Sequence, residues 1–245
     1  MMSSIALQNP GVEVYLKEIM PKVQKALRPD QIFCSVGGST KEDYVNIVKV
    51  FNKEFSAEQI AALEINAACP NVHTGGGAVS KNPEEFYDML NEIVKSSSIP
   101  VIAKIPTDFD RFCESAKAAE AAGVQAIYTT NTPVGMAIDI KTGKTKTGRL
   151  KAPLSGPAIK PLGIASTWDL YNAVQIPVIA SGGISCMEDA IEYMMAGATG
   201  VAIGCTTFVQ PDIAEQIAHQ MNRYVEETNL ESISEIVGKT HRICG

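Results

Sequence analysis

A strand–helix alternation repeats along the whole chain and is the feature that most restricts its fold. Short runs rich in β-branched residues end in Gly, Asn or Pro, and segments with helical periodicity lie between them. Six such runs occur, at residues 32–38, 62–68, 100–106, 126–132, 177–183 and 200–206. The runs are apolar on both faces, which is typical of parallel strands covered by helices. The sequence therefore predicts an α/β fold, either a barrel or an open doubly wound sheet.

Capping residues mark the helices that we expect between these runs. Ser39 or Thr40, ahead of two acidic residues, predicts the start of a helix over 39–54. Asn82, followed by a proline, predicts the start of a helix over 82–97. Further helical patterns cover residues 12–27 and 108–123.

The composition excludes several classes of protein. A formal net charge of −6 argues against nucleic acid or an anionic membrane as the main partner. The longest apolar stretches are strand-sized, so no transmembrane helix is predicted, and the N-terminal stretch lacks the pattern of a signal peptide. The six cysteines form no C-x-x-C pair, which favours a reducing cytoplasm over a disulfide or zinc framework.

The alternation runs through the chain without a break in composition, so a single domain over 1–245 is expected. One long insertion, at about 133–156, is rich in Gly and Lys and resembles a hairpin. In barrels, insertions after a strand cover the active-site face. The six strand–helix units fall short of the eight that a closed barrel contains.

Polar residues and glycines follow the predicted strands, where parallel α/β folds gather ligand-binding groups. The stretch EINAACPNV places Asn66 and Cys69 at the end of an apolar run. The residues at the equivalent positions, near the ends of other predicted strands, are Lys104, Asn131, Thr132, Gly182, Gly183 and Gly204.

Each of these residues allows two interpretations. Lys104 is either a functional cation at the last inward position of a strand or a surface lysine that reaches solvent. Cys69 is either a general base or a small buried residue. Asn66 and Asn131 either bind a ligand with donor and acceptor edges or cap loops. The glycines on the last two strands, Gly182, Gly183 and Gly204, form either a phosphate site or tight turns.

Eight stretches together resemble the dihydroorotate dehydrogenase family, in particular the soluble class 1 enzymes of type 1B, which pair with an iron–sulfur flavoprotein subunit. They match in order, at family spacing, over essentially the whole chain: IALQNPGVEV, LEINAACPNV, VIAKIP, NTPVGMAIDIKTGK, LSGPAIKP, IPVIASGGI, AGATGVAIG and ESISEIV. The resemblance implies a TIM-type (β/α)8 barrel, here N-terminally truncated to about six βα units. It also implies FMN as cofactor and the oxidation of dihydroorotate to orotate in pyrimidine biosynthesis.

The same resemblance implies a role for each matching residue. Cys69 would remove a proton from substrate C5 while the hydride at C6 goes to flavin N5. Asn66 would touch both flavin and substrate, and Lys104 would lie at the N1–C2 edge of the flavin. The residues implied for the cofactor are Asn66, Lys104, Thr130, Gly156, Gly182, Gly183, Gly204 and Cys205. Those implied for the substrate are Ile5, Ala6, Leu7, Asn66, Asn71, Asn131 and Thr132.

The chain also departs from the family pattern. The first two βα units of the family would precede residue 1 of this sequence. Ser3 and Ser35 stand where the family has asparagines, Cys205 where it has a threonine and Ala6 where it has a glycine.

Three functions follow as hypotheses. The first is a dihydroorotate dehydrogenase-like flavin oxidoreductase, a cytoplasmic homodimer with an FAD/iron–sulfur subunit as its expected electron-transfer partner. The second is an FMN oxidoreductase acting on a related dihydropyrimidine. The third is an inactive short relative that serves as a binding or regulatory subunit.

Overall fold

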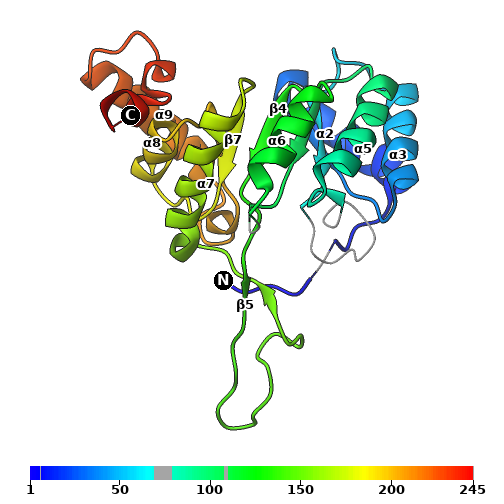
Figure 1. Ribbon diagram of the computed structural model, residues 1–245, viewed down its shortest axis with the longest axis horizontal. Helices are drawn as coiled ribbons and strands as arrows, with labels where there is room; N and C mark the ends of the chain where they lie inside the picture. Colours follow the sequence, from blue (N-terminus) through cyan, green and yellow to red (C-terminus); the bar gives the residue numbers. More distant parts are fainter. Residues whose placement is uncertain (6, 69–78, 108–109, 245) are drawn as a thin grey trace. The chain divides into compact units, whose positions relative to one another are not determined.

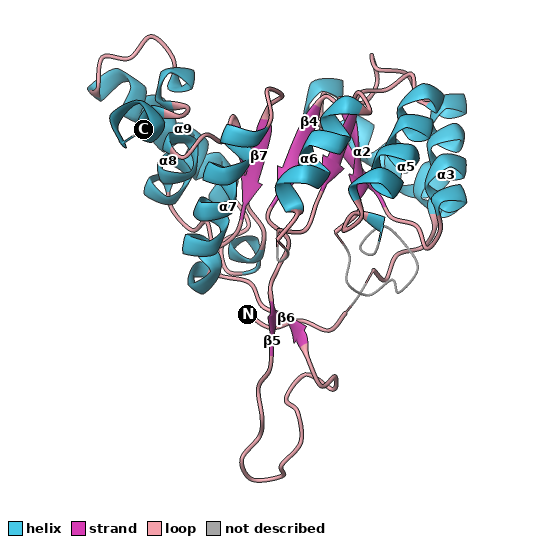
Figure 2. Cartoon of the chain, viewed as in Figure 1, coloured by secondary structure: helices cyan, strands magenta, loops and turns pink. Residues whose placement is uncertain are grey.

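The computed structural model describes residues 1–5, 7–68, 79–107 and 110–244. The chain divides into two compact units (Figure 1). Unit 1 comprises Met1–Ser4 and Tyr128–Gly245, and unit 2 comprises Ile5–Ile127. Strands followed by helices make up both units, so the predicted α/β alternation is confirmed (Figure 2).

Unit 2 is built on three parallel strands. They are β1 (Phe33–Val36), β2 (Ala62–Asn66) and β3 (Val101–Lys104), and β2 lies between the other two. The register pairs Ser35 with Glu64 and Asn66 with Lys104. Since paired residues of parallel strands point to the same face, these four side chains share one face of the sheet.

Helices cover the other face of this sheet. The helical elements of unit 2 are α1 (Val12–Val14), η1 (Tyr15–Ile19), α2 (Met20–Ala26), η2 (Pro29–Gln31), α3 (Lys41–Glu54), α5 (Pro83–Ser96) and α6 (Phe112–Ala121). Of these, α2, α3, α5 and α6 contribute buried residues. Val48 of α3, together with Phe86 and Leu90 of α5, is completely buried, as are Leu63 and Ile65 of β2. These residues form the apolar core of unit 2.

Two of the predicted helix starts are confirmed by their caps. The Thr40 side chain accepts a hydrogen bond from the Asp43 N–H, and Asp43 accepts one from the Thr40 N–H, which makes a reciprocal capping box. At α5 the Asn82 side chain accepts from the N–H groups of Glu84 and Glu85.

The predicted helix over 12–27 is a succession of α1, the π-helical η1 and α2. Pro21 gives a physical reason for the change. A proline has no N–H, so Pro21 cannot donate to the carbonyl of Lys17 four residues earlier.

The strand β1 lies at the edge of its sheet, and its side chains alternate in burial. Cys34 and Val36 are buried against the helices, whereas Phe33, on the opposite face, is 56% exposed. An exposed aromatic ring on an edge strand is apolar surface that another segment of protein could cover.

Unit 1 contains a second parallel pair of strands, β7 (Val178–Ser181) and β8 (Gly200–Ala202). The strand β4 (Ala126–Thr129) crosses from unit 2 into unit 1. The other elements of unit 1 are β5 (Val134–Gly135), β6 (Ala152–Pro153), η3 (Pro157–Ile159), α7 (Lys160–Ala173), α8 (Met187–Met195), η4 (Cys205–Phe208), α9 (Ile213–Glu227), η5 (Ile233–Ile236) and α10 (Lys239–Cys244).

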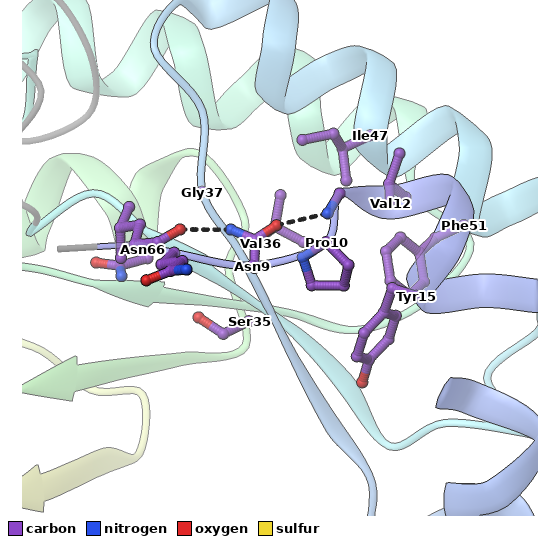
Figure 3. Close-up of a pocket in the computed structure, with 13 residues that line it drawn as sticks. Asn9, Pro10, Val12, Tyr15, Ser35, Val36, Gly37, Ile47, Phe51 and Asn66 are labelled. Carbon is purple, nitrogen blue, oxygen red and sulfur yellow. Dashed lines mark hydrogen bonds between the residues drawn. The ribbon is translucent and has the colours of Figure 1, made fainter. Parts of the chain in front are cut away.

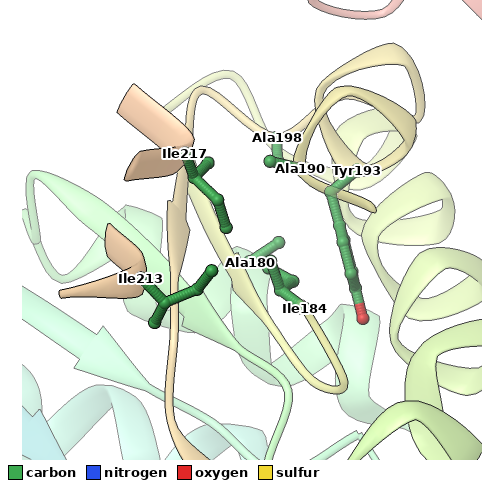
Figure 4. Packing of buried hydrophobic residues seen from close by; sticks show 7 residues of the cluster. All are labelled: Ala180, Ile184, Ala190, Tyr193, Ala198, Ile213 and Ile217. Atoms are coloured by element: carbon green, nitrogen blue, oxygen red, sulfur yellow. The ribbon is translucent and has the colours of Figure 1, made fainter. Parts of the chain in front are cut away.

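The core of unit 1 forms between β7 and the helices α8 and α9. Ala180 of β7 packs with Tyr193 of α8 and with Ile213 and Ile217 of α9 (Figure 4). The tyrosine ring is fully buried in this cluster. A second cluster places Met194 against Ile236 of η5.

The insertion at 133–156 is a hairpin, as the sequence predicts. β5 and β6 pair in antiparallel fashion at its base, and Asp139 closes a turn by accepting from the N–H groups of Lys141 and Thr142. Ile140, near the tip, is 95% exposed. The hairpin extends away from the helices of unit 1 (Figure 1).

Candidate active site

Polar side chains of unit 2 gather on the sheet face that the helices leave uncovered. Ser35 lies on β1, Glu64 and Asn66 on β2, and Lys104 is the last residue of β3. The hydroxyl of Ser35 donates to Glu64 Oε1 at 2.9 Å. Polar residues therefore occupy the carboxyl ends of three neighbouring strands, where parallel α/β folds bind their ligands.

Asn66 is held in place by its surroundings. The Tyr44 hydroxyl donates to the Asn66 carbonyl at 2.9 Å, and the Ala68 N–H donates to Asn66 Oδ1 at 3.4 Å. The side chain of Asn66 is half-buried, as is that of Lys104, with which it is paired in the β2–β3 register. The structure thus brings together two of the side chains that the sequence predicts for the cofactor.

A pocket of about 390 Å³ opens beside this face. Asn66, Ser35 and Asn9 give it a polar side, and Tyr15 and Phe51 belong to its apolar side (Figure 3). A ligand with a polar edge and an apolar body would match this lining.

The loop that borders the pocket is braced by its own asparagine. Asn9 Nδ2 donates to the Leu7 carbonyl at 2.6 Å, and the Gly11 N–H donates to Asn9 Oδ1 at 2.9 Å (Figure 3). Gly11 has φ of 86°, a conformation that glycine adopts without strain. Leu7 lines the pocket, and Ile5 is exposed two residues earlier.

Three of the predicted site residues, Ala6, Cys69 and Asn71, lie outside the described residues. The catalytic role that the resemblance implies for Cys69 therefore remains a prediction.

In unit 1, a second set of predicted residues follows β4. Thr130 is buried, and Asn131 and Thr132 are half-buried. The Thr130 N–H donates to Ser181 Oγ at 3.2 Å, and Ser181 Oγ lies 3.1 Å from the Thr130 carbonyl, to which it donates. Ser181, the last residue of β7, thus fixes the segment that carries the predicted substrate contacts.

The predicted glycines of unit 1 have different surroundings. Gly156, Gly182 and Gly183 have φ values of 105°, 123° and 72°, which other residues rarely adopt. A Cβ on Gly183 would lie 2.7 Å from the Gly156 carbonyl oxygen, so this turn packs tightly against the start of α7. A Cβ on Gly204 would meet nothing within 4 Å, so the chain leaves open space there.

Cys205 follows Gly204 at the start of η4 and is half-buried. The next residue, Thr206, donates from its hydroxyl to the Ile184 carbonyl at 2.8 Å. This bond connects η4 to the loop after β7. The turn that contains Gly204 is therefore held against the turn that contains Gly182 and Gly183.

Two supporting groups of unit 1 were missed by sequence reasoning. Lys160 Nζ donates to Asp189 Oδ1 and Glu192 Oε2, each at 2.7 Å, and so connects α7 to α8. The hydroxyl of Tyr193 donates to the Gly182 carbonyl at 2.7 Å. The contacts of both groups form only when segments far apart in the sequence pack together, and the apolar pattern of the sequence does not indicate such contacts.

Burial and hydrogen bonding shift the pKa values of these supporting groups. Burial alone would raise the pKa of Asp189, but the hydrogen bonds from Lys160 and Ser185 outweigh it and lower the pKa to about 2. Burial raises the pKa of Tyr193, and the nearby carboxylates of Asp189 and Glu192 raise it further. The tyrosine hydroxyl therefore stays protonated and acts as a donor.

Within the described residues, no group of three or more His, Cys, Asp or Glu side chains is placed to hold a metal ion. In the same part of the chain, no helix is both long and apolar enough to cross a membrane.

Parallel strands with polar side chains at their carboxyl ends are typical of the α/β enzymes that bind ligands at that edge. The dihydroorotate dehydrogenase family model matches residues 1–225 of this chain. Proteins from Bacillus mycoides and Bacillus cereus named dihydroorotate dehydrogenase B (NAD(+)), catalytic subunit, are each 38% identical over 240 residues, 98% of this chain and 76% of the relative. The chain belongs to the dihydroorotate dehydrogenase family, a family of oxidoreductases.

A solved structure gives the same result for the fold. A crystal structure of DHODH in complex with ferulenol, from Eimeria tenella, matches with a TM-score of 0.78 at 17% identity and covers 98% of this chain and 71% of its own. The predicted fold class, a shortened barrel of the TIM type, is confirmed at this level.

Proposed function

We propose that this chain catalyses the FMN-dependent oxidation of dihydroorotate to orotate in pyrimidine biosynthesis. The observation that carries the proposal is the family match along nearly the whole chain, including the neighbouring Asn66 and Lys104 at the ends of β2 and β3. An amide and an ammonium side by side suit a ring that has carbonyl and N–H edges and gains negative charge on reduction.

The turns of unit 1 fit the phosphate of FMN. Among the described residues, the N–H groups of Gly183 and Ile184 donate to no protein acceptor, although both residues are buried. Backbone N–H groups that lack a protein acceptor can donate to a ligand, and a phosphate oxygen would accept from them. The residues that would hold the phosphate end are Gly156, Gly182, Gly183, Gly204 and Cys205, and those that would hold the ring are Asn66, Lys104 and Thr130.

When bound, FMN supplies the acceptor for the hydride that leaves the substrate. The chain's own residues then have two tasks. Cys69, as the thiolate, accepts the proton from substrate C5, and Lys104 stabilises negative charge beside the ring. Substrate orientation is assigned to Asn66, Asn71, Asn131 and Thr132, and cover of the substrate to Ile5, Ala6 and Leu7.

Flavin loading and anaerobic reduction test the proposal directly. The purified chain is mixed with FMN, gel-filtered to remove free flavin and titrated with dihydroorotate without oxygen. We expect a yellow protein whose flavin absorbance is bleached by dihydroorotate. A chain that cannot be loaded with FMN contradicts the proposal.

Replacement of the predicted base gives the first specific prediction. Cys69→Ser should slow flavin reduction by about 100-fold or more, because removal of a positioned base typically costs about 10²–10⁴ in rate. The remaining rate should need a higher pH than wild type, since a serine hydroxyl is far less acidic than a thiol with a pKa of about 8.5. Stopped-flow reduction over a pH series measures both effects. Cys244→Ser, an exposed change in α10, should behave as wild type; an equal loss in both variants would contradict the role of Cys69.

A related dihydropyrimidine is a second candidate substrate, favoured by the altered loop over the substrate. Ser3 donates from its backbone N–H to the Pro153 carbonyl at 3.2 Å, so the chain leading to this loop is fixed to the base of the hairpin. Anaerobic titration with dihydrouracil beside dihydroorotate distinguishes the two. Faster bleaching by dihydrouracil would support the second candidate.

The exposed edge strand favours a third candidate, a binding or regulatory subunit. Phe33 of β1, a strand at the end of the sheet order, is exposed. Under this candidate, the chain alone would bind no FMN and would elute in size-exclusion chromatography as an aggregate or only with a partner. A stable monodisperse protein with bound flavin would contradict it.

We also propose partners and a location for the chain. Its relatives are named as catalytic subunits, which implies that a separate subunit accompanies them. We assign to this chain a homodimer in the cytoplasm that passes electrons to an FAD/iron–sulfur subunit. Cell fractionation and co-purification with an FAD-containing protein test the location and the partner.

A further inference from the structure

The buried hydroxyl of Tyr193 contacts the backbone of the turn after β7. Tyr193 Oη lies 2.7 Å from the Gly182 carbonyl oxygen, 3.2 Å from that of Ser181 and 3.3 Å from that of Lys160. A phenol has one proton to donate, so the shortest contact, to Gly182, is the principal bond. The hydroxyl thus meets the turn at the residue whose φ of 123° sets its direction.

The packing around Tyr193 fixes the position of this hydroxyl. The ring is fully buried among Ala180, Ile184, Ala190 and Ile217, and its hydroxyl end points out of this apolar cluster (Figure 4). A Cβ on Gly163 of α7 would lie 2.0 Å from the hydroxyl oxygen. Glycine inside a helix costs about 1 kcal/mol relative to alanine, and here it provides the space in which the hydroxyl sits.

The turn that the hydroxyl supports also carries unpaired backbone donors. Gly183 and Ile184 directly follow the bonded carbonyl of Gly182, and among the described residues their N–H groups find no protein acceptor. A shift of the Gly182 peptide would therefore redirect these donors. Because no side chain of the described residues accepts from these N–H groups, their direction depends on the backbone conformation of the turn alone.

We propose that Tyr193 is a positioning residue for phosphate binding: its hydroxyl holds the Gly182 carbonyl so that the following N–H groups face the phosphate monoester of the flavin. This inference rests on the proposed function and extends it to a residue outside the strand ends. It assigns Tyr193 no contact with the flavin itself.

The test compares FMN with riboflavin, which lacks the phosphate. Dissociation constants of both flavins for the full chain are measured by fluorescence titration in wild type and in Tyr193→Phe, which keeps the ring and removes only the hydroxyl. We expect FMN binding to weaken by about 5- to 10-fold, the effect of one lost hydrogen bond, and riboflavin binding to change by less than about 2-fold. Tyr224→Phe, which removes a hydroxyl from α9, should leave both constants unchanged.

A second measurement does not depend on flavin. Hydrogen exchange followed by mass spectrometry should show faster exchange in the peptide containing Gly182–Ile184 in Tyr193→Phe than in wild type. Thermal melting confirms that the variant is folded. An unchanged ratio of FMN to riboflavin affinity in a folded variant overturns the inference and leaves the proposed function standing. A wild-type chain that binds neither flavin overturns the proposed function and, with it, the phosphate role.

Discussion

Gly163 and Tyr193 form a pair in which each residue depends on the other. A methyl group at 163 would overlap the tyrosine hydroxyl at 2.0 Å and would still approach the Ser181 carbonyl at 3.0 Å. Neither residue looks functional in the sequence, because a lone glycine in a helix and a tyrosine in an apolar helix face are common. The pair is defined only when α7 and α8 pack together.

A double-mutant cycle measures this dependence. Gly163→Ala should destabilise the protein by about 1–3 kcal/mol, since overpacking outweighs the gain in helix propensity. In the Tyr193→Phe background the same change should cost less, because the nearest remaining ring atom would be 3.0 Å from the methyl group. Urea unfolding of the four proteins gives the coupling energy. Strictly additive effects would contradict the pairing.

The candidate binding residues at strand ends could be anticipated from the sequence. Asn66 and Lys104 end apolar runs, and the structure places them side by side in the β2–β3 register. Ser181 and Tyr193 could not be anticipated, because they act by bonding to backbone carbonyls that lie far from them in space until the chain folds.

At the scale of elements, α7 and α8 are joined by the ion pairs of Lys160. Asp189 is almost completely buried at this junction and also accepts from the Ser185 N–H and hydroxyl, each at 2.8 Å. Its pKa of about 2 in the folded chain lies below the value of about 3.9 expected when unfolded. The ionised carboxylate therefore contributes stability above about pH 5, and that contribution is lost as the pH falls through 4 toward 2.

Asp189→Asn should remove this contribution. We expect a loss of about 2 kcal/mol at neutral pH and a smaller difference from wild type near pH 3, where the wild-type carboxyl begins to protonate. Urea unfolding at a series of pH values measures the difference. Asp169→Asn, an exposed change in α7, serves as the control. A difference that does not shrink on acidification would show that charge is not the cause.

The strands were predictable as elements, and one helix was not. The six apolar runs contain β1, β2, β3, β4, β7 and β8, because short apolar runs between turn residues are visible directly in the sequence. The expected burial on both faces is not general, since β1 and β7 bury alternate residues only. The predicted helix over 12–27 changes to a π-helix at Tyr15–Ile19. Pro21 marks the cause in the sequence, but whether a helix ends, kinks or widens before a proline depends on what it packs against.

At the scale of the whole molecule, the hairpin at 133–156 differs from the rest of the chain. Its five cations and one carboxylate give the hairpin a charge of +4. Because the net charge of the chain is −6, the remaining residues together carry −10. Ile140, Met136 and Leu150 expose apolar side chains on it. The rest of a second copy carries a net negative charge, opposite in sign to that of the hairpin, which supports the proposed homodimer.

Removal of the apolar side chains of the hairpin should weaken that dimer. Met136→Ser with Ile140→Ser keeps the charge, and we expect the dissociation constant to rise at least about 10-fold, since burying one such side chain is worth about 1.5–3 kcal/mol. Sedimentation velocity measures the change, and added salt should weaken the wild-type dimer. Ile243→Ser, an exposed change in α10, is the matched control. A monomeric wild type would contradict the dimer.

The brace that Asn9 forms beside the pocket has a chemical consequence. An asparagine commonly deamidates when the backbone nitrogen of the next residue attacks its side-chain amide and closes a five-membered imide. This attack requires a nitrogen that carries a hydrogen. The next residue here is Pro10, whose nitrogen has none. The amide that joins the Leu7 carbonyl and the Gly11 N–H therefore cannot deamidate through this imide, which preserves both hydrogen bonds against the commonest route of asparagine loss.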